Sequence, residues 1–473
     1  MYAVCLSLLG VAYHVAAHGD PTDGVRARIA GTIAYVLAHG PIRPASDVGV
    51  ARGGGPCALH LADVVSGVSS AVSVGSQSPD LGALSFSPLG DLLLLAEDRS
   101  QEVAIERASA LWGLDTSGRL TQIVEAPFGV FQEQACFSQD FAPRYVWSPE
   151  GSKIATWGHF PTHANGDRFR FYVVDLKNGK LKRWLAGADE LPPIGWHPNG
   201  RDLLVPGNRD DWQREPSTDL LTALPMFRVR ADKGDRNVVF RYLPGCKAIV
   251  PMGKTGVVLT LEHGGLVETD IGRGSRLGYG LPPDGRLIGR PVVSPDGLWI
   301  AASFLAASSV PSYAIDAPRE LRPSVGVALY DLDWDRKTAN YPAWYDMLPP
   351  AIFELGLIPR RFHPNMFSDL RQPAISIRWT ADSKYIVRCI ASQWFPKPGE
   401  EGDEFADGVV DVIEVETGKR WEIFRVKGHV LNIDWSPLKY EIKPQPAVPS
   451  PPSSPTSTKA GGSKKGGKQV RHT

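Results

Sequence analysis

The chain has 473 residues, a formal net charge of zero at pH 7, and 43% hydrophobic residues including 13 tryptophans, which is ample for a core. Five basic residues fall within the last fifteen positions, so the rest carries 46 basic against 51 acidic residues. This mildly acidic body argues against nucleic acid as the main partner. Five cysteines lie far apart without a Cys-x-x-Cys pair, which indicates buried thiols rather than a disulfide framework or zinc site.

The first seventeen residues have two alternative interpretations. Met1–Ala17 is apolar apart from Ser7 and His14, and Val15-Ala-Ala17 resembles a signal-peptidase site, but a basic n-region is absent. A leader predicts an extracytoplasmic (periplasmic or secreted) protein. A first strand predicts a cytoplasmic one, and a wrongly assigned start is a further alternative. The segment is shorter than the ~20 residues of a membrane span, so no stable span is expected.

A short motif recurs along the chain: an apolar residue, Ser-Pro, a variable residue and Gly. Proline presets φ at the second turn position, and Gly accepts conformations that other residues resist, so each copy predicts a strand, a tight turn and a strand. The copies are Phe86-Ser-Pro-Leu-Gly90, Trp147-Ser-Pro-Glu-Gly151, Trp196-His-Pro-Asn-Gly200 and Val293-Ser-Pro-Asp-Gly297, with weaker ones at Trp379-Thr-Ala-Asp-Ser383 and Trp435-Ser-Pro437.

The spacing of these landmarks predicts seven repeating units. The gap between Trp196 and Val293 is about twice the preceding one, and a degenerate copy at Ile249-Val-Pro-Met252 lies halfway through it. Each predicted unit has four strands, which we label a to d in chain order. In unit two they are expected at 144–147, 153–158, 169–176 and 181–185, with an Asn178-Gly179 hairpin turn before strand d. Four short strands per unit at this period predict an all-β, seven-bladed β-propeller with antiparallel blades.

The two ends of the chain each supply part of one blade. Residues 31–39, 58–67 and 71–74 are expected to form strands b, c and d of a blade without a strand a, and 430–436 to form a strand a without the others. Because an open ring would expose an unpaired strand edge, we expect strands from both termini to close it.

The Ser-Pro-x-Gly turns, and strands that end in Asp before a Gly turn, resemble the TolB-type and WD40-like (PD40-type) β-propeller families over roughly residues 25 to 440. The Gly-His and Trp-Asp dipeptides of true WD40 repeats are mostly missing, which favours the TolB-like side. The resemblance implies a fold and says little about activity, because such propellers host unrelated functions.

Long connections are unevenly distributed over the predicted blades. Turns a–b and c–d are short, whereas b–c and d–a connections are long, and in an antiparallel blade these leave from the same face. Loops on a rigid scaffold are where binding usually resides. The long connections are 159–168, 207–225, 306–323 and 392–407 between b and c, and 125–143 and 338–373 between d and a.

Three motifs with possible chemistry favour structural interpretations. Gly253-Lys-Thr255 lacks the earlier Gly and following helix of a phosphate-binding loop. In His159-Phe-Pro-Thr-His163, near Asp167, the proline prevents a helix from aligning two metal ligands. Aspartates recur near the ends of strands c, where an Asp accepts local backbone N–H bonds; they are Asp115, Asp175, Asp270 and Asp331.

We therefore expect a binding site on the face with long connections. Tyr, Trp and Arg are enriched at binding hot spots, and the 338–373 insertion is rich in aromatics. The alternative is that these aromatics pack the insertion onto the propeller. The predicted partner-binding residues are Trp344, Tyr345, Arg361, Trp394, Phe395 and Trp212.

The sequence predicts three parts: an N-terminal segment at 1–20, a propeller at 21–443 and a disordered Pro/Ser then Gly/Lys-rich tail at 444–473. We expect a monomeric, non-catalytic binding or scaffold module with a protein partner and no cofactor or metal. The alternative is a propeller enzyme of hydrolase or lyase type, with polar or metal-binding residues at the mouth of the central channel.

Overall fold

A computed structural model describes most of the predicted strands, and the ranges below define the described residues. They are 21–38, 42–44, 51–53, 57–74, 80–98, 109–126, 145–159, 169–186, 195–206, 213–214, 221–231, 236–242, 246–252, 256–262, 265–273, 276–279, 285–306, 324–331, 375–392, 394–396, 403–405 and 407–441.

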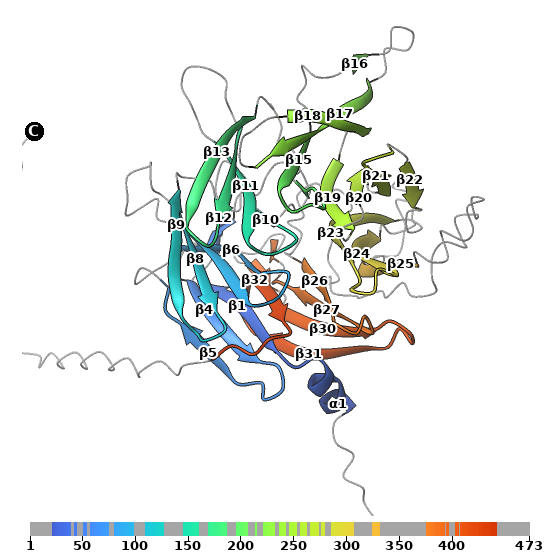
Figure 1. Ribbon diagram of the computed structural model, residues 1–473. Coiled ribbons are helices and arrows are strands. Elements are labelled where there is room, and N and C mark those ends of the chain that lie inside the picture. Colours follow the sequence, from blue (N-terminus) through green and yellow to red (C-terminus); the bar gives the residue numbers. More distant parts are fainter. Residues whose placement is uncertain are drawn as a thin grey trace, which may run out of the picture.

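Seven antiparallel sheets stand around a common centre, which confirms the seven-bladed β-propeller (Figure 1). Blades one to six follow one another along the chain. Blade one has β6 (Asp80–Phe86), β7 (Leu92–Asp98), β8 (Ser109–Asp115) and β9 (Leu120–Ala126). Blade two has β10 (Tyr145–Trp147), β11 (Lys153–His159), β12 (Phe169–Asp175) and β13 (Lys180–Ala186). Blade three has β14 (Gly195–Trp196), β15 (Asp202–Pro206), β17 (Leu221–Arg230) and β18 (Arg236–Tyr242), with β16 (Gln213–Arg214) added to β17.

Blades four, five and six follow in chain order. Blade five has three strands among the described residues, and the other two have four. Blade four has β19 (Cys246–Met252), β20 (Val257–Glu262), β21 (Gly265–Asp270) and β22 (Arg276–Tyr279). Blade five has β23 (Gly285–Val293), β24 (Trp299–Ala306) and β25 (Ser324–Asp331). Blade six has β26 (Ile375–Trp379), β27 (Tyr385–Ile390), β30 (Gly408–Glu414) and β31 (Arg420–Val426).

Strands from both termini form blade seven, as the sequence predicts. β32 (His429–Ser436) is its first strand and pairs antiparallel with β1 (Thr32–Ala38), which pairs in turn with β4 (Cys57–Asp63). β5 (Ser69–Val72) is the outer strand. The register places Trp435 opposite Ile33 and Ser436 opposite Thr32. This pairing covers an edge of β32 that would otherwise expose backbone donors and acceptors.

The recurring motif forms nearly identical turns between the first two strands of the blades. In the first copy the N–H of Gly90 donates to the Ser87 carbonyl at 2.9 Å, and four further copies repeat that distance at their own positions. The side chain at the Ser position also accepts a bond from the next strand: the N–H of Trp299 donates to Ser294 Oγ at 2.9 Å. Ser or Thr is therefore favoured there because the hydroxyl ties the two strands together.

Glycine is favoured in these turns for its backbone conformation. Gly151 and Gly297 have φ of 72° and 73°, which confirms the left-handed conformation expected from the sequence. Ser383 takes the same position in blade six with φ of 59°. At Gly90 space adds a second constraint, since a Cβ there would lie 2.6 Å from Ser436 Oγ.

The landmark tryptophans join neighbouring blades. In three copies of the motif, the indole N–H donates to the preceding blade. The acceptor is the residue directly before the first residue of that blade's motif, so the tryptophan links two neighbouring sheets across the seam between them. The bonds run from Trp147 to Ser85 Oγ at 2.9 Å, from Trp196 to the Val146 carbonyl at 2.8 Å, and from Trp379 to the Val292 carbonyl at 3.1 Å.

The core consists of apolar layers between adjacent blades rather than one central cluster. A helix that the sequence reading did not anticipate, α1 (Pro21–Arg28), extends the layer between blades six and seven. Val25 and Ile29 are buried in that layer, and Arg26 Nη2 donates to the Ile423 carbonyl at 3.0 Å. Among the described residues no helix is long and apolar enough to cross a membrane.

Candidate binding face and inner strands

Three blades carry additional strands in their b–c connections. The hairpin of β2 (Ile42–Pro44) and β3 (Ala51–Gly53) lies between β1 and β4 of blade seven. The hairpin of β28 (Trp394–Pro396) and β29 (Asp403–Phe405) lies between β27 and β30 of blade six. In blade three, β16 pairs with an extended β17. Because the b–c connections of antiparallel blades leave from the same face, these strands enlarge one side of the ring.

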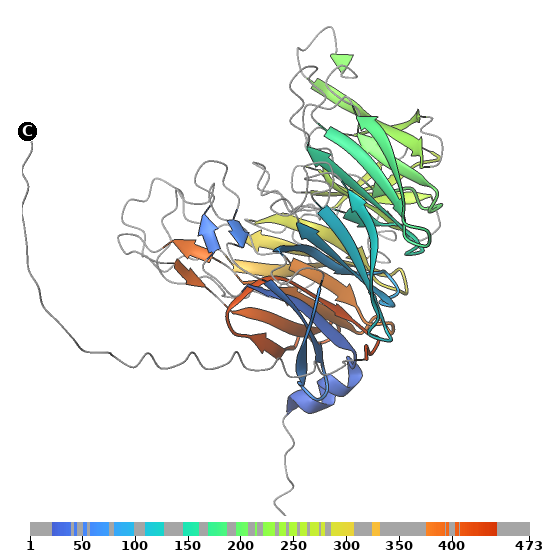
Figure 2. The same cartoon turned by 90° about the vertical axis from the view of Figure 1, so that its left-hand side faces the viewer.

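Figure 2 shows the blue hairpin β2–β3 and the orange hairpin β28–β29 projecting from the same side of the ring. We call this side the loop face. The opposite side carries the short a–b and c–d turns, and we call it the turn face. The expected asymmetry between the two faces is therefore present in blades six and seven.

The predicted partner-binding residues fall in two groups. Trp394 and Phe395 lie in β28, where Trp394 is opposite Phe405 and Phe395 is opposite Glu404. Their strand is therefore on the loop face, as the sequence predicts. The other four lie outside the described residues, so their proximity to β28 stays a prediction; they are Trp212, Trp344, Tyr345 and Arg361.

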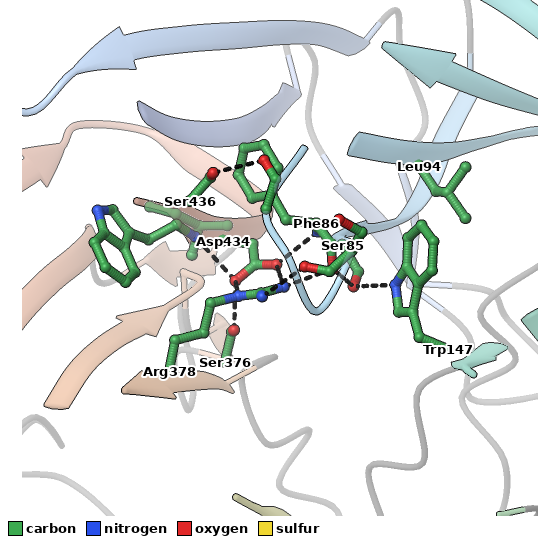
Figure 3. A network of polar contacts seen from close by, with 12 residues as sticks. Ser85, Phe86, Leu94, Trp147, Ser376, Arg378, Asp434 and Ser436 are labelled. Atoms are coloured by element: carbon green, nitrogen blue, oxygen red, sulfur yellow. Dashed lines mark hydrogen bonds and ion pairs between the residues drawn. The ribbon is translucent and has the colours of Figure 1, made fainter. Parts of the chain in front are cut away.

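At the inner side of the ring, Asp434 of β32 joins three blades (Figure 3). Arg378 of β26 binds both carboxylate oxygens, with Nε 2.9 Å from Oδ1 and Nη2 2.7 Å from Oδ2. Ser376 Oγ donates to Oδ1 at 2.6 Å, and the backbone N–H of Phe86 in blade one donates to Oδ2 at 2.8 Å. The Arg378 guanidinium also donates to the carbonyls of Phe86 and Ser87.

This group, which we call the closure ion pair, is saturated with hydrogen bonds. The side chain of Asp434 is 3% exposed and that of Arg378 19% exposed. Burial by itself lowers the pKa of Arg378, but the charge of Asp434 and their hydrogen bonds outweigh it, so the pKa stays above its ordinary value. With both charges and most donors occupied, the pair holds blades six, seven and one together and offers little to a ligand.

A second buried charge cluster lies inside blade six. Arg388 of β27 and Asp411 of β30 are both fully buried and meet at 2.5 Å, and Arg420 Nε adds a bond to Asp411 at 3.1 Å. Burial lowers the pKa of Arg388, and the charge of Asp411 opposes that shift. The cluster joins three strands of one sheet, which is a structural role.

A third arginine, Arg290 of β23, differs from both. Its Nη2 donates to the Ile249 carbonyl of β19 in blade four at 2.8 Å, and no ion pair with an acid is present among the described residues. The side chain is half-buried, and burial lowers its pKa to about 10. Arg290 is therefore a partly desolvated cation whose charge is not balanced by a neighbouring carboxylate.

Three of the four recurring aspartates have the structural role that the sequence favours, and the side chain of the fourth, Asp331, lies outside the described residues. Asp115 Oδ1 accepts the backbone N–H groups of Ser117 and Arg119, each at 3.0 Å. Asp175 and Asp270 accept equivalent bonds from residues two positions later. For Asp115 the hydrogen bond from the Ser117 hydroxyl is the largest cause that lowers its pKa. These carboxylates fix the c–d turns of the turn face.

The two ligand-like motifs gain no support from the described residues. Strand β20 begins at Val257, directly across from Met252 in a hairpin, where a phosphate-binding loop would start a helix. His163 and Asp167 lie outside the described residues. In the part of the chain that the structure describes, no group of three His, Cys, Asp or Glu side chains has a metal-binding arrangement.

No protein-family profile and no curated protein matches the sequence. Solved structures similar to the chain include TolB from Acinetobacter baumannii, with 14% identity, 86% of this chain and 66% of that chain covered, and a TM-score of 0.39. The chain thus spans slightly less than two thirds of that TolB. A functionally unknown protein from Desulfotomaculum acetoxidans matches at 12% identity over 86% of this chain and 99% of its own, with a TM-score of 0.46.

An oligogalacturonate lyase from Vibrio parahaemolyticus matches at 12% identity over 77% of this chain and 84% of its own, with a TM-score of 0.41. The matches thus include TolB and also an enzyme. At these identities they do not distinguish binding from catalysis. What the described residues define is a class: a seven-bladed β-propeller closed by both termini.

Sequence reasoning missed the closure ion pair and Arg290. Asp434 directly precedes the landmark Trp435, and Arg378 directly precedes Trp379. The available signal was a charged residue at a position that the other copies of the motif fill with Ser85, Val146, Gly195 or Val292. It becomes informative only when blade one is known to supply the Phe86 N–H and the Phe86 and Ser87 carbonyls that complete the group.

Proposed function

We propose that this protein is a non-catalytic binding and scaffold module that recognises a protein partner through its loop face. The observation that carries the proposal is the presence of extra strands in three b–c connections, β2–β3, β28–β29 and β16, all of which leave from that face. A rigid ring of interlocked blades holds these connections in place, and such positions commonly bind partners.

The chemistry of the loop face fits a protein partner. Trp394 and Phe395 lie in β28 of this face, and aromatic side chains supply much of the energy at protein interfaces. The 338–373 connection adds Trp344, Tyr345 and Arg361 in the sequence. Its prolines restrict the backbone and lower the entropy lost when large side chains are ordered on binding.

The test is a cross-linking capture experiment with the full chain as bait, followed by affinity measurement on the captured partner. Trp344→Ala and Trp394→Ala should each weaken binding by at least ~2 kcal/mol, about thirtyfold, while the melting temperature stays unchanged. The matched control is Leu89→Ala, because Leu89 is a large hydrophobic residue, 62% exposed, in a turn of the opposite face. That variant should bind as the wild type does.

Two results would contradict the proposal. Leu89→Ala could abolish binding while both tryptophan variants bind normally, which would place the interface on the turn face. Alternatively, both tryptophan variants could unfold without a selective loss of binding, which would make these side chains packing residues.

A further inference from the structure

We propose that Arg290 binds an oxyanion, a carboxylate or phosphate group, on the inner side of the ring between blades four and five. The inference is independent of the loop face, because a small anion or an acidic group of a larger partner satisfies the same chemistry. It rests on the position of the residue, on its hydrogen bonds and on its charge.

The position of Arg290 is set by an irregularity in the innermost strand of blade five. Between the pairs Ile288–Ser303 and Val292–Ala301 the register of β23 against β24 shifts, so β23 carries extra residues around Arg290. Bulges of this kind redirect a side chain and are frequent beside functional sites. β23 pairs only with β24, so its other edge faces the middle of the ring (Figure 1).

The side chain reaches from blade five to blade four. β23 contacts β19, and Nη2 of Arg290 donates to the carbonyl of Ile249 in that strand. Gly195 of blade three also approaches Ile249, since a Cβ on it would lie 2.9 Å from the same carbonyl oxygen. The guanidinium is therefore held where the innermost strands of three consecutive blades meet.

Within the part of the chain that the structure describes, most hydrogen-bond donors of Arg290 have no acceptor. A guanidinium has five N–H groups in a planar fork, and the bond to Ile249 uses one of them. Arg378, on the innermost strand of the next blade, donates instead to two carboxylate oxygens and two carbonyls. The contrast shows that this ring can satisfy an inner arginine fully, whereas among the described residues Arg290 has one hydrogen-bond partner.

The charge of Arg290 is costly where it lies. Burial is the cause that lowers its pKa to about 10, and no acid of the described residues forms an ion pair with it. A partly desolvated cation without a counterion is unfavourable, and an oxyanion relieves that cost while receiving two parallel N–H bonds from the free side of the fork. Lysine cannot supply this bidentate geometry.

The test measures binding of sodium phosphate and of sodium succinate by calorimetry, against sodium chloride at equal ionic strength, on the full chain. We expect saturable binding of at least one oxyanion. Arg290→Met and Arg290→Lys should each lower the association constant at least tenfold, about the effect of one hydrogen bond to a charged group. Arg273→Met is the matched control, because Arg273 is an exposed arginine of blade four, and it should bind as the wild type does.

Thermal unfolding in the same three salts separates this role from a structural one. The oxyanion that binds should raise the melting temperature of the wild type more than that of Arg290→Met. Whether phosphate or succinate has this effect tells which of the two groups binds. In chloride, Arg290→Met should be no less stable than the wild type, because it removes an unbalanced charge. Equal destabilisation of Arg290→Met in all three salts, or equal oxyanion affinity for wild type and both variants, overturns the proposal.

Discussion

Two contacts between neighbouring blades involve the same position of the repeat, the residue directly before the motif, but in different chemistry. Between blades two and three, the indole of Trp196 donates to the carbonyl of Val146, the residue before the landmark of blade two. At the closure, the residue before the landmark of blade seven is Asp434, which binds Arg378 of blade six and the Phe86 N–H of blade one. There the indole N–H of Trp435 is buried with no hydrogen-bond partner among the described residues.

The comparison indicates what closure requires. An ordinary seam joins blades that follow one another in the chain, so one neutral hydrogen bond and an apolar layer suffice. The Arg378–Asp434 pair itself also joins consecutive blades, six and seven. Its bonds to Phe86 and Ser87 of blade one, however, join segments 291 to 348 residues apart, and ordering these segments costs chain entropy. A buried bidentate ion pair with further hydrogen bonds is selective for one arrangement, because a displaced β32 would leave two buried charges unpaired.

The largest expected effect comes from removing the N-terminal half of the closure. Deleting residues 1–75 removes β1, β4 and β5 and exposes an edge of β32, so we expect loss of cooperative unfolding or a strongly lowered melting temperature. Deleting 444–473 should leave the melting temperature unchanged. Calorimetry on both truncations checks this, and equal melting temperatures would show that the closure contributes nothing.

A smaller but still large effect is expected at the closure ion pair. Asp434→Ala removes the acid that pairs with the Arg378 guanidinium among the described residues, which should destabilise the fold by about 3–5 kcal/mol in urea unfolding. Glu422→Gln is the control, because Glu422 pairs with Arg425 at 2.6 Å on the surface of blade six with both side chains more than a third exposed. That variant should cost no more than about 1 kcal/mol, and similar losses for both would remove the distinction between the seams.

Two turn glycines, one beside the closing strand β32 and one in blade five, are expected to differ in how much their replacement destabilises the fold. Gly297→Val forces a β-branched residue into φ of 73° in open space, which should cost about 1–3 kcal/mol. Gly90→Val meets the same strain and also contacts Ser436, the last residue of β32, and Pro437 after it, so overpacking should add about 1–3 kcal/mol. Denaturation midpoints measure both, and an unchanged midpoint for Gly297→Val would contradict the expected turn.

The smallest expected effect is the difference in stability between Trp196→Phe and Trp435→Phe. Trp196→Phe and Trp435→Phe lose similar volume at sites that are 0% and 1% exposed, but the first also leaves the Val146 carbonyl without its donor. We expect Trp196→Phe to be more destabilising by about 1 kcal/mol. If Trp435→Phe proves equally or more destabilising in urea unfolding, the indole bond does not account for the ordinary seam.

Much of the fold follows from local sequence. Ser-Pro-x-Gly specifies its turn through contacts within five residues, such as that of Ser294 Oγ with the Trp299 N–H, so it predicts the same turn wherever it occurs. The closure could also be predicted, because three strands without a first strand and one without the others complete a single blade. For the binding site, the structure describes two of the six predicted residues, Trp394 and Phe395 in β28, and the role of all six in binding stays a prediction.

By itself, then, the sequence determined the repeat, its turns, the number of blades and the partnership of the two ends, because each depends on neighbours in the chain or on period. Only the tertiary structure decided which distant groups meet. Asp434 binds Arg378 and the Phe86 N–H, whereas Arg290 binds a carbonyl one blade away and, among the described residues, no acid. Those contacts depend on the curvature that brings inner strands together, and no local pattern encodes whether an arginine there will find a carboxylate.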